Sequence, residues 1–251
     1  MRVNNVEYGN VKRWSRGKDP GLVLYTPFSE GRGTVTKDYS EHGNNGTLEG
    51  GPRWVRGKFK FGSALNFITD DYVDCGVFLD TNENFSVNAQ IYITETPTNN
   101  TKYIVTKGKI SEYQFDFRIN TSRQLELAIF TTTGASYLVA TSSVLDLYTW
   151  YHVAGVYIKA TSASVYVNGI LDGIDIETFP TKETQLGAKV YIGDRETTAE
   201  DRSFTGTIDF ARMYNRELNA QEAQFHVKHC PPLAAPHRYH NLAAGLRAIT
   251  V

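Results

Sequence analysis

Strict alternation of apolar and polar side chains is the feature that most constrains the fold of this chain. It runs through FSVNAQIYI (85–93), YQFDFRI (113–119) and QLELAIF (124–130). A period of two residues is typical of extended strands, because successive side chains point to opposite faces of a sheet. One apolar and one polar face predicts antiparallel sheets with one face on a core and the other in water.

The spacing of these runs predicts a sandwich of two sheets. Strands recur about every ten residues, separated by Gly, Asn, Ser and Thr, which is the rhythm of an all-β domain. The Asn-Gly pair in VYVNGIL (165–171) predicts a hairpin with the preceding strand TWYHVAGVYI (149–158). One short helix is expected at Asn219–Lys228, where Asn219 and Glu222 form a capping-box pattern. A chain of 251 residues can hold one such domain.

We therefore expect three parts: a basic N-terminal arm (1–20), one sandwich domain (21–222), and a helix end with an extended tail (223–251). The arm lacks the apolar stretch of a signal peptide. It is expected either to be solvated or to dock on a neighbouring subunit. No apolar run is long enough for a membrane span. The net charge of −1 gives no bulk attraction to nucleic acid.

The order of several motifs resembles one known family. The motifs are GLVLYTPFSEGRGTVTKDYSEHGNNGTL (21–48), GKFKFGSALNF (57–67), DDYVDCG (70–76), NFSVNAQIYI (84–93), YIVTKG (103–108), TWYHVAGVYI (149–158), VYVNG (165–169), VYIGD (190–194) and FTGTIDFARMYNREL (204–218). Together they resemble the LamG-like jelly-roll domains of the concanavalin A-like lectin/glucanase superfamily. The resemblance implies an all-β, two-sheet antiparallel jelly roll and an extracellular or virion-associated location. Gln90 stands where family members usually have Trp.

The resemblance also implies one structural Ca²⁺ between the first loop and the last strand. Asp38, Asn44, Asn45 and Asp209 match the positions of its ligands. Calcium takes six to eight oxygens, many of them from Gly- and Asn-rich loops. The alternative is that Asp209 accepts hydrogen bonds from neighbouring backbone or from Arg212, since an unpaired carboxylate is costly to bury.

The acidic residues predict that the chain is not an enzyme. Glucanase relatives carry acidic residues at alternate positions of one strand. In GIDIE (173–177), Asp175 and Glu177 share a face, but Gly173 stands where the first carboxylate should be. Two-carboxylate glycoside hydrolysis therefore lacks a partner here.

Recognition of a glycan or a cell-surface polymer is the predicted function, by a non-catalytic, lectin-like domain. The alternative is a structural or assembly protein, a virion or surface-layer component that uses the sandwich as a building block. Candidate ligand-binding residues lie on the polar strand faces and in the end loops. They are Asn88, Gln90, Tyr92, Gln114, Asp116 and Arg118 on the faces, and Tyr113, Tyr137, Asp194 and Arg195 in the loops. The faces could equally be ordinary wet surface, and loops more often carry function.

Overall fold

The computed structural model describes residues 19–58, 62–79, 83–109, 112–130, 136–176, 187–194 and 202–223. They form two antiparallel sheets, which confirms the predicted sandwich. Most of the predicted arm and nearly all of the predicted tail lie outside the described residues. Within these ranges, no helix has the length and apolar character needed to span a membrane.

Sheet A has the strand order β14-β13-β12-β7-β16-β5-β4, and β1 pairs with β16. Its strands are β1 (Leu22–Thr26), β4 (Arg53–Arg56), β5 (Ser63–Phe67), β7 (Phe85–Ile93), β12 (Trp150–Ile158), β13 (Ser162–Val167), β14 (Ile170–Asp175) and β16 (Gly206–Tyr214). Strands β7, β12 and β16, which are distant in sequence, are therefore direct neighbours at the centre of this sheet.

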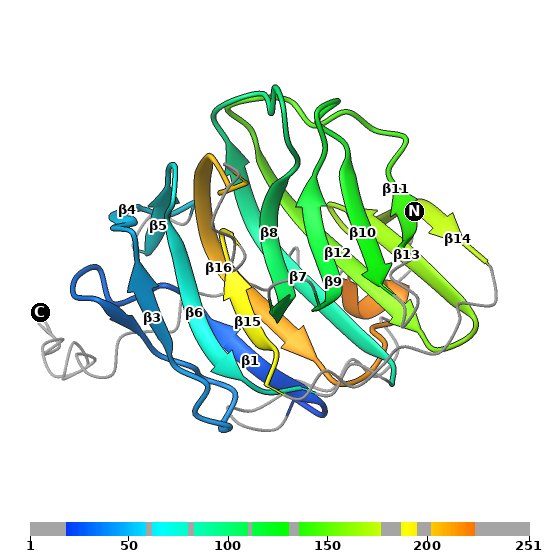
Figure 1. The fold of residues 1–251 in the computed structure, drawn as a ribbon, viewed down its shortest axis with the longest axis horizontal. Coiled ribbons are helices and arrows are strands. Elements are labelled where there is room, and N and C mark those ends of the chain that lie inside the picture. The colour runs from blue at the N-terminus through cyan, green and yellow to red at the C-terminus, as the bar shows by residue number, and fades with distance from the viewer. Residues whose placement is uncertain are drawn as a thin grey trace, which may run out of the picture.

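Sheet B has the order β11-β10-β9-β8-β15-β6-β3-β2. Its strands are β2 (Val35–Thr36), β3 (Gly46–Glu49), β6 (Tyr72–Val77), β8 (Lys102–Lys109), β9 (Glu112–Ile119), β10 (Leu125–Phe130), β11 (Ser136–Ala140) and β15 (Lys189–Ile192). Figure 1 shows the two sheets stacked on each other, with β8, β9 and β10 overlying β7 and β12.

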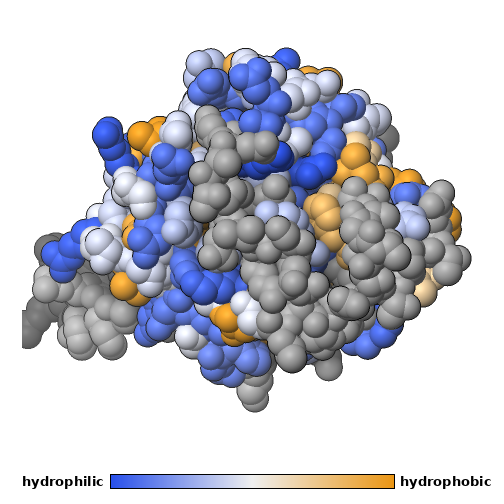
Figure 2. Space-filling view, in the orientation of Figure 1, coloured by the Kyte–Doolittle hydropathy of each residue, from blue (hydrophilic) through white to orange (hydrophobic). Residues whose placement is uncertain are grey.

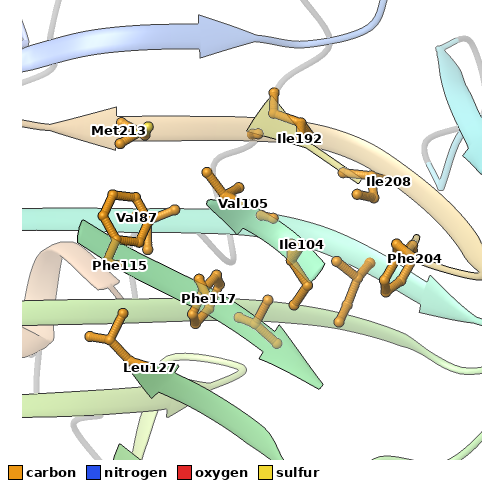
Figure 3. Packing of buried hydrophobic residues seen from close by; sticks show 14 of the residues in the cluster. Val87, Ile104, Val105, Phe115, Phe117, Leu127, Ile192, Phe204, Ile208 and Met213 are labelled. Carbon is orange, nitrogen blue, oxygen red and sulfur yellow. The ribbon is translucent and has the colours of Figure 1, made fainter. Parts of the chain in front are cut away.

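The core lies between the sheets and is built from the apolar face of each alternating strand. Figure 3 shows Val87 from sheet A beside Phe115, Phe117 and Leu127 from sheet B. All four side chains are fully buried. Burying a side chain of this size stabilises the fold by about 1.5–3 kcal/mol. Gly155 on β12 leaves room for this packing, because a Cβ there would lie 3.2 Å from the ring of Phe117.

The expectation of a wet outer face is wrong for the central strands β7 and β9. On β7, Ser86, Asn88 and Gln90 are buried, and on β9, Gln114 and Asp116 are buried as well. At one end of sheet A, the segment that follows β16 covers the outer face, and the backbone N–H of Leu218 donates to Ser86 Oγ. Alternation reports the polarity of a face, and it does not report whether another layer covers that face.

The predicted hairpin of 149–158 with the next strand forms as β12 and β13, and the predicted capping box is confirmed. The Asn-Gly pair does not close that hairpin; it lies at the following turn, between β13 and β14. Asn168 and Gly169 both have positive φ, 51° and 77°, as a two-residue hairpin turn between β13 and β14 requires. In the capping box, the backbone N–H of Glu222 donates to Asn219 Oδ1 at 2.9 Å. The N–H of Asn219 donates in return to Glu222 Oε2 at 3.0 Å.

Replacing Asn219 by alanine is expected to lower the free energy of unfolding by about 1 kcal/mol, because it removes the acceptor that caps the helix. Urea unfolding of the full chain measures the loss. Asn219→Ser should recover most of it, since serine also caps. The exposed Gln221→Ala serves as control and should leave stability unchanged. Equal stability of Asn219→Ala and wild type would contradict the capping role.

Candidate functional site

The strand register brings Gln90, a candidate ligand residue, into the centre of the outer face of sheet A. Gln90 on β7 stands opposite His152 on β12 and opposite Phe210 on β16. Two residues further along the same face, Tyr92 stands opposite Trp150. The face therefore carries a polar region and an aromatic region side by side.

The aromatic region consists of Tyr92, Tyr148 and Trp150, and we call it the aromatic row. The ring centroids of Tyr92 and Trp150 are 5.2 Å apart, and those of Tyr92 and Tyr148 are 6.3 Å apart. Tyr148 is 65% exposed and has a φ of 58°. A bulky side chain at positive φ costs about 1–3 kcal/mol, and such strain clusters at functional sites. The fold thus holds an exposed aromatic ring in place at an energetic cost.

The polar region consists of Gln90, His152 and Asp209, and we call it the polar floor. All three side chains are buried. Within the described part of the chain, Gln90 Nε2, both ring nitrogens of His152, and Asp209 Oδ2 have no hydrogen-bond partner. Asp209 sits where the register between β16 and β7 shifts, and it accepts a hydrogen bond from the backbone of Lys58. The sequence predicts such a backbone contact as the alternative to a calcium site at Asp209.

Burial sets the protonation of the polar floor. Burial, together with the nearby charges of Arg212 and Lys58, lowers the pKa of His152 to about 3. His152 is therefore neutral at physiological pH, so that one ring nitrogen is able to donate a hydrogen bond and the other to accept one. Burial raises the pKa of Asp209 to about 6, against the backbone N–H and the charge of Lys58. Above that pH the carboxylate is an acceptor only.

The raised pKa of Asp209 predicts that stability falls as pH rises from about 4 to about 6, because the folded chain holds this proton more tightly than the unfolded chain. At pH values above about 6, the shift of the pKa from 3.8 to about 6 lowers the free energy of unfolding by about 3 kcal/mol. Asp209→Asn is expected to recover much of this free energy at pH 7 and to flatten the profile. Urea unfolding across pH 4–8 measures it, with the exposed Asp70→Asn as control. A profile unchanged by Asp209→Asn would contradict the assignment.

Arg212 borders the polar floor and is held by two rings. Its guanidinium carbon lies 4.2 Å from the ring centroid of Tyr25 and 5.0 Å from that of Phe210. The candidate ligand residue Asn88 is buried and stands opposite Arg212 in the register. The structure thus places Asn88, Gln90 and Tyr92 along one line on β7, with the buried members inside and Tyr92 nearer the surface.

The candidates on sheet B form a separate, internally paired group. Arg118 Nε donates to Glu126 at 2.8 Å, and its Nη1 lies 3.4 Å from Asp116. Asn120 Nδ2 donates to the other oxygen of Glu126 at 2.8 Å. Gln114 is buried on the same strand. Arg118 and Asp116, which were candidates for binding a ligand, therefore already contact other side chains of the protein.

The expectation of end loops is wrong for Tyr113 and Tyr137, which lie in β9 and β11, and the predicted end-loop residues do not come together at one place. The ring of Tyr113 packs against Phe130, and Tyr137 packs half-buried against the core. Both lie near the end of sheet B where β9 begins. Asp194 follows β15 toward the opposite end, is buried, and accepts a hydrogen bond from Ser203. Arg195 lies outside the described residues.

The predicted calcium ligands of the first loop are engaged in hydrogen bonds within the protein. Asp38 Oδ1 accepts hydrogen bonds from the backbone N–H groups of Tyr25 and Ser40, and Oδ2 accepts from the Ser40 hydroxyl and the N–H of Asn44. Asn45 Oδ1 accepts from the N–H of Asp38. These hydrogen bonds hold the loop in place. The calcium site stays a prediction.

No group of three or more His, Cys, Asp or Glu side chains that could hold a metal occurs among the described residues. Asp209 belongs to the polar floor and contacts Lys58.

Sequence reasoning missed three residues of this site. His152 is packed within the sheet, but its ring makes no hydrogen bond to any described residue. Trp150 and Tyr148 were not singled out. The alternation of the strand was the available signal. Val153 faces the core, so Trp150 and His152, which alternate with Tyr151 and Val153, point to the opposite face. Which residue of β7 each one meets depends on the register.

A family model described as the concanavalin A-like lectin/glucanases superfamily matches residues 67–224. No curated protein matches the chain. Among solved structures, Trypanosoma rangeli sialidase in complex with sialic acid is similar at 18% identity with a TM-score of 0.61. The match covers 82% of this chain and 32% of the sialidase, so the chain spans about a third of that enzyme.

Two further matches are domains of larger proteins. Domain 4 of AbnA, an extracellular arabinanase from Geobacillus stearothermophilus, in complex with arabinotriose, has 19% identity and a TM-score of 0.63. That match covers 81% of this chain and 96% of the domain. The receptor-binding domain of botulinum neurotoxin type G has 18% identity and a TM-score of 0.61. That match covers 83% of this chain and 51% of the neurotoxin domain. At these identities the likeness shows the fold.

The prediction that the chain is not an enzyme is wrong as a conclusion, because the matched structures include sialidases beside binding domains. The missing carboxylate at Gly173 excludes only chemistry that needs a pair of carboxylates. Sialidases use a tyrosine nucleophile instead. The chain has 15 tyrosines. The missing carboxylate therefore does not exclude a reaction with a tyrosine nucleophile.

Proposed function

The chain belongs to the concanavalin A-like lectin/glucanase superfamily, and on that premise we propose that it is a lectin-like recognition domain for glycan or a cell-surface polymer. The observation that carries the proposal is the aromatic row at the surface of sheet A, next to the polar floor. Tyr92 and Trp150 are half-buried and Tyr148 is exposed, so all three rings can be reached by a ligand.

This combination suits a sugar. Ligand sites pair apolar and aromatic surface with a few placed polar groups that fix orientation. A sugar ring has an apolar face that packs on an aromatic ring and hydroxyl groups at its rim that need partners. The aromatic row supplies the first kind of contact. The polar floor, one step along the same strands, supplies the second.

The matched structures support the same class of ligand. The arabinanase domain was solved with arabinotriose and the sialidase with sialic acid. Both ligands are carbohydrates, one neutral and one acidic, and both are held by proteins that contain this fold.

The experiment is a binding screen of the full-length chain against immobilised arabinotriose, lactose and 3′-sialyllactose, in calcium and again in EDTA. Saturable binding to at least one sugar is the expected result, and absence of binding to any sugar in either buffer would overturn the proposal. Binding abolished by EDTA would support the structural Ca²⁺, and equal binding in both buffers would contradict it. Release of free sialic acid in the same wells would show hydrolysis.

An assembly role is the second candidate, favoured by an exposed apolar edge. Ile170, Leu171, Ile174 and Ile176 are exposed on or beside β14, the edge strand of sheet A. Figure 2 shows hydrophobic surface on the right, where Figure 1 places β14 and β11. An apolar edge strand is a template for pairing with another chain. Light scattering should then show an oligomer that Ile170→Lys with Ile174→Lys dissociates; a monomeric wild type would exclude this role.

A further inference from the structure

We propose that the polar floor binds hydroxyl groups of a neutral sugar whose ring stacks on the aromatic row. This inference rests on the proposed function and specifies the site and the ligand class. It concerns Gln90, His152 and Asp209, which come from β7, β12 and β16.

The polar floor is unusual because its polar atoms are buried and without partners. Gln90 is 1% exposed, His152 0% and Asp209 5%. Gln90 Nε2, His152 Nδ1 and Nε2, and Asp209 Oδ2 make no hydrogen bond to any residue within the described ranges. Buried polar groups in native proteins are nearly always paired, and each exception needs an explanation. Three neighbouring exceptions indicate one shared partner that brings its own polar atoms.

The unpaired atoms match a hydroxyl group. A hydroxyl donates one hydrogen bond and accepts others. Gln90 Nε2 can donate to it, Asp209 Oδ2 can accept from it, and the neutral ring of His152 can do either. An aliphatic or aromatic ligand would leave all of these atoms unpaired. A polyhydroxylated ring satisfies them.

The spacing along the strands suits a ligand of that size. Trp150 and His152 are two residues apart on the same face of β12, as are Tyr92 and Gln90 on β7. Two residues of a strand span about 7 Å. A ring stacked on Trp150 and Tyr92 therefore places its rim, with a hydroxyl or hydroxymethyl group, toward Gln90 and His152.

The charges favour a neutral sugar over an acidic one. The unpaired acceptor of the floor is the carboxylate of Asp209, which would repel a carboxylate on the ligand. The guanidinium of Arg212 is stacked on Tyr25 and Phe210. Lys58 borders the floor through its contact with Asp209. Both cations therefore already have contacts, whereas Asp209 Oδ2 has no hydrogen-bond partner within the described ranges.

The test is calorimetric titration of lactose, arabinotriose and 3′-sialyllactose into the full-length protein and its variants. Lactose and 3′-sialyllactose differ only by the acidic sugar. In Gln90→Met and His152→Phe, apolar groups of similar size replace the unpaired atoms. Each variant is expected to weaken binding of the neutral sugars by about tenfold or more, the equivalent of one lost hydrogen bond to a buried group.

Melting temperature separates a binding role from a structural role. Because the replaced atoms have no partners, the melting temperatures of Gln90→Met and His152→Phe should equal or exceed that of wild type. The control is Thr106→Val on sheet B, whose hydroxyl donates to the backbone carbonyl of Asp194. It should lower the melting temperature and leave binding unchanged.

The outcomes separate this inference from the proposed function. If wild type binds sugars and both floor variants bind them equally well, the inference is overturned and the recognition function stands. Tighter binding of 3′-sialyllactose than of lactose would also overturn the neutral-sugar assignment. If wild type binds none of the three sugars, the proposed function fails and the inference fails with it.

Discussion

Trp150→Ala is expected to weaken sugar binding by about 30-fold or more, because truncating a central aromatic anchor typically costs 2 kcal/mol or more of binding free energy. Trp150 begins β12, is half-buried, and its ring lies 5.2 Å from that of Tyr92. Removing it takes away the largest flat surface of the aromatic row. Calorimetric titration of the sugars that bind wild type measures the change.

Two control variants make this result specific. Trp150→Phe keeps an aromatic ring and should retain most of the affinity. Trp54→Ala removes a half-buried tryptophan whose indole N–H donates to the carbonyl of Gly33, away from the aromatic row. It should leave affinity unchanged. Equal affinities of Trp150→Ala and wild type would show that sugars bind elsewhere.

Asp38→Ala is expected to lower the free energy of unfolding by about 3–5 kcal/mol, because hydrogen bonds to a charged group contribute roughly 1.5–3 kcal/mol each and part of this loss is recovered by water. The carboxylate accepts from the N–H groups of Tyr25, Ser40 and Asn44 and from the Ser40 hydroxyl. It therefore ties the loop after β2 to strand β1. Urea unfolding measures the loss.

Ser40→Ala is the matched control, because it removes only the hydroxyl contact to Asp38 and should cost about 1 kcal/mol. A loss below that value for Asp38→Ala would contradict the role of the carboxylate as organiser of the loop. Unfolding repeated with calcium adds a second readout. A calcium-dependent gain in wild type that Asp38→Ala abolishes would support the predicted metal site.

Local features of the fold could be predicted from the sequence. The alternation in 85–93 identifies the core face of β7 because side chains alternate whatever the strand pairs with. The Asn168–Gly169 turn depends on two residues that tolerate positive φ. The capping box joins Asn219 and Glu222, which are three residues apart. Each of these signals is complete within a few residues.

The candidate site could be predicted only in part, because it depends on strand pairing. Gln90 and Tyr92 were identified from the polar face of one strand. Their partners His152 and Trp150 belong to β12, and Asp209 belongs to β16, where the register shifts. No local pattern tells which residues of distant strands meet. Nor does alternation show that Asn88 and Asp116, expected in water, are buried.

The prediction about catalysis failed for a different reason. The missing carboxylate at Gly173 is a sound argument against one mechanism, and it was extended to all catalysis. The sialidase matches show that the fold also occurs within enzymes of another kind. The absence of one catalytic motif therefore excludes only the mechanism that needs this motif.

The most direct measurement is a crystal structure of the full-length chain soaked with the neutral sugar that binds it most tightly. The account predicts a sugar ring stacked on Trp150 and Tyr92, with a hydroxyl within hydrogen-bond distance of Gln90 and His152. A sugar bound instead over the Arg118–Glu126 network of sheet B, or at the Asp38 loop, with the aromatic row empty, would contradict it.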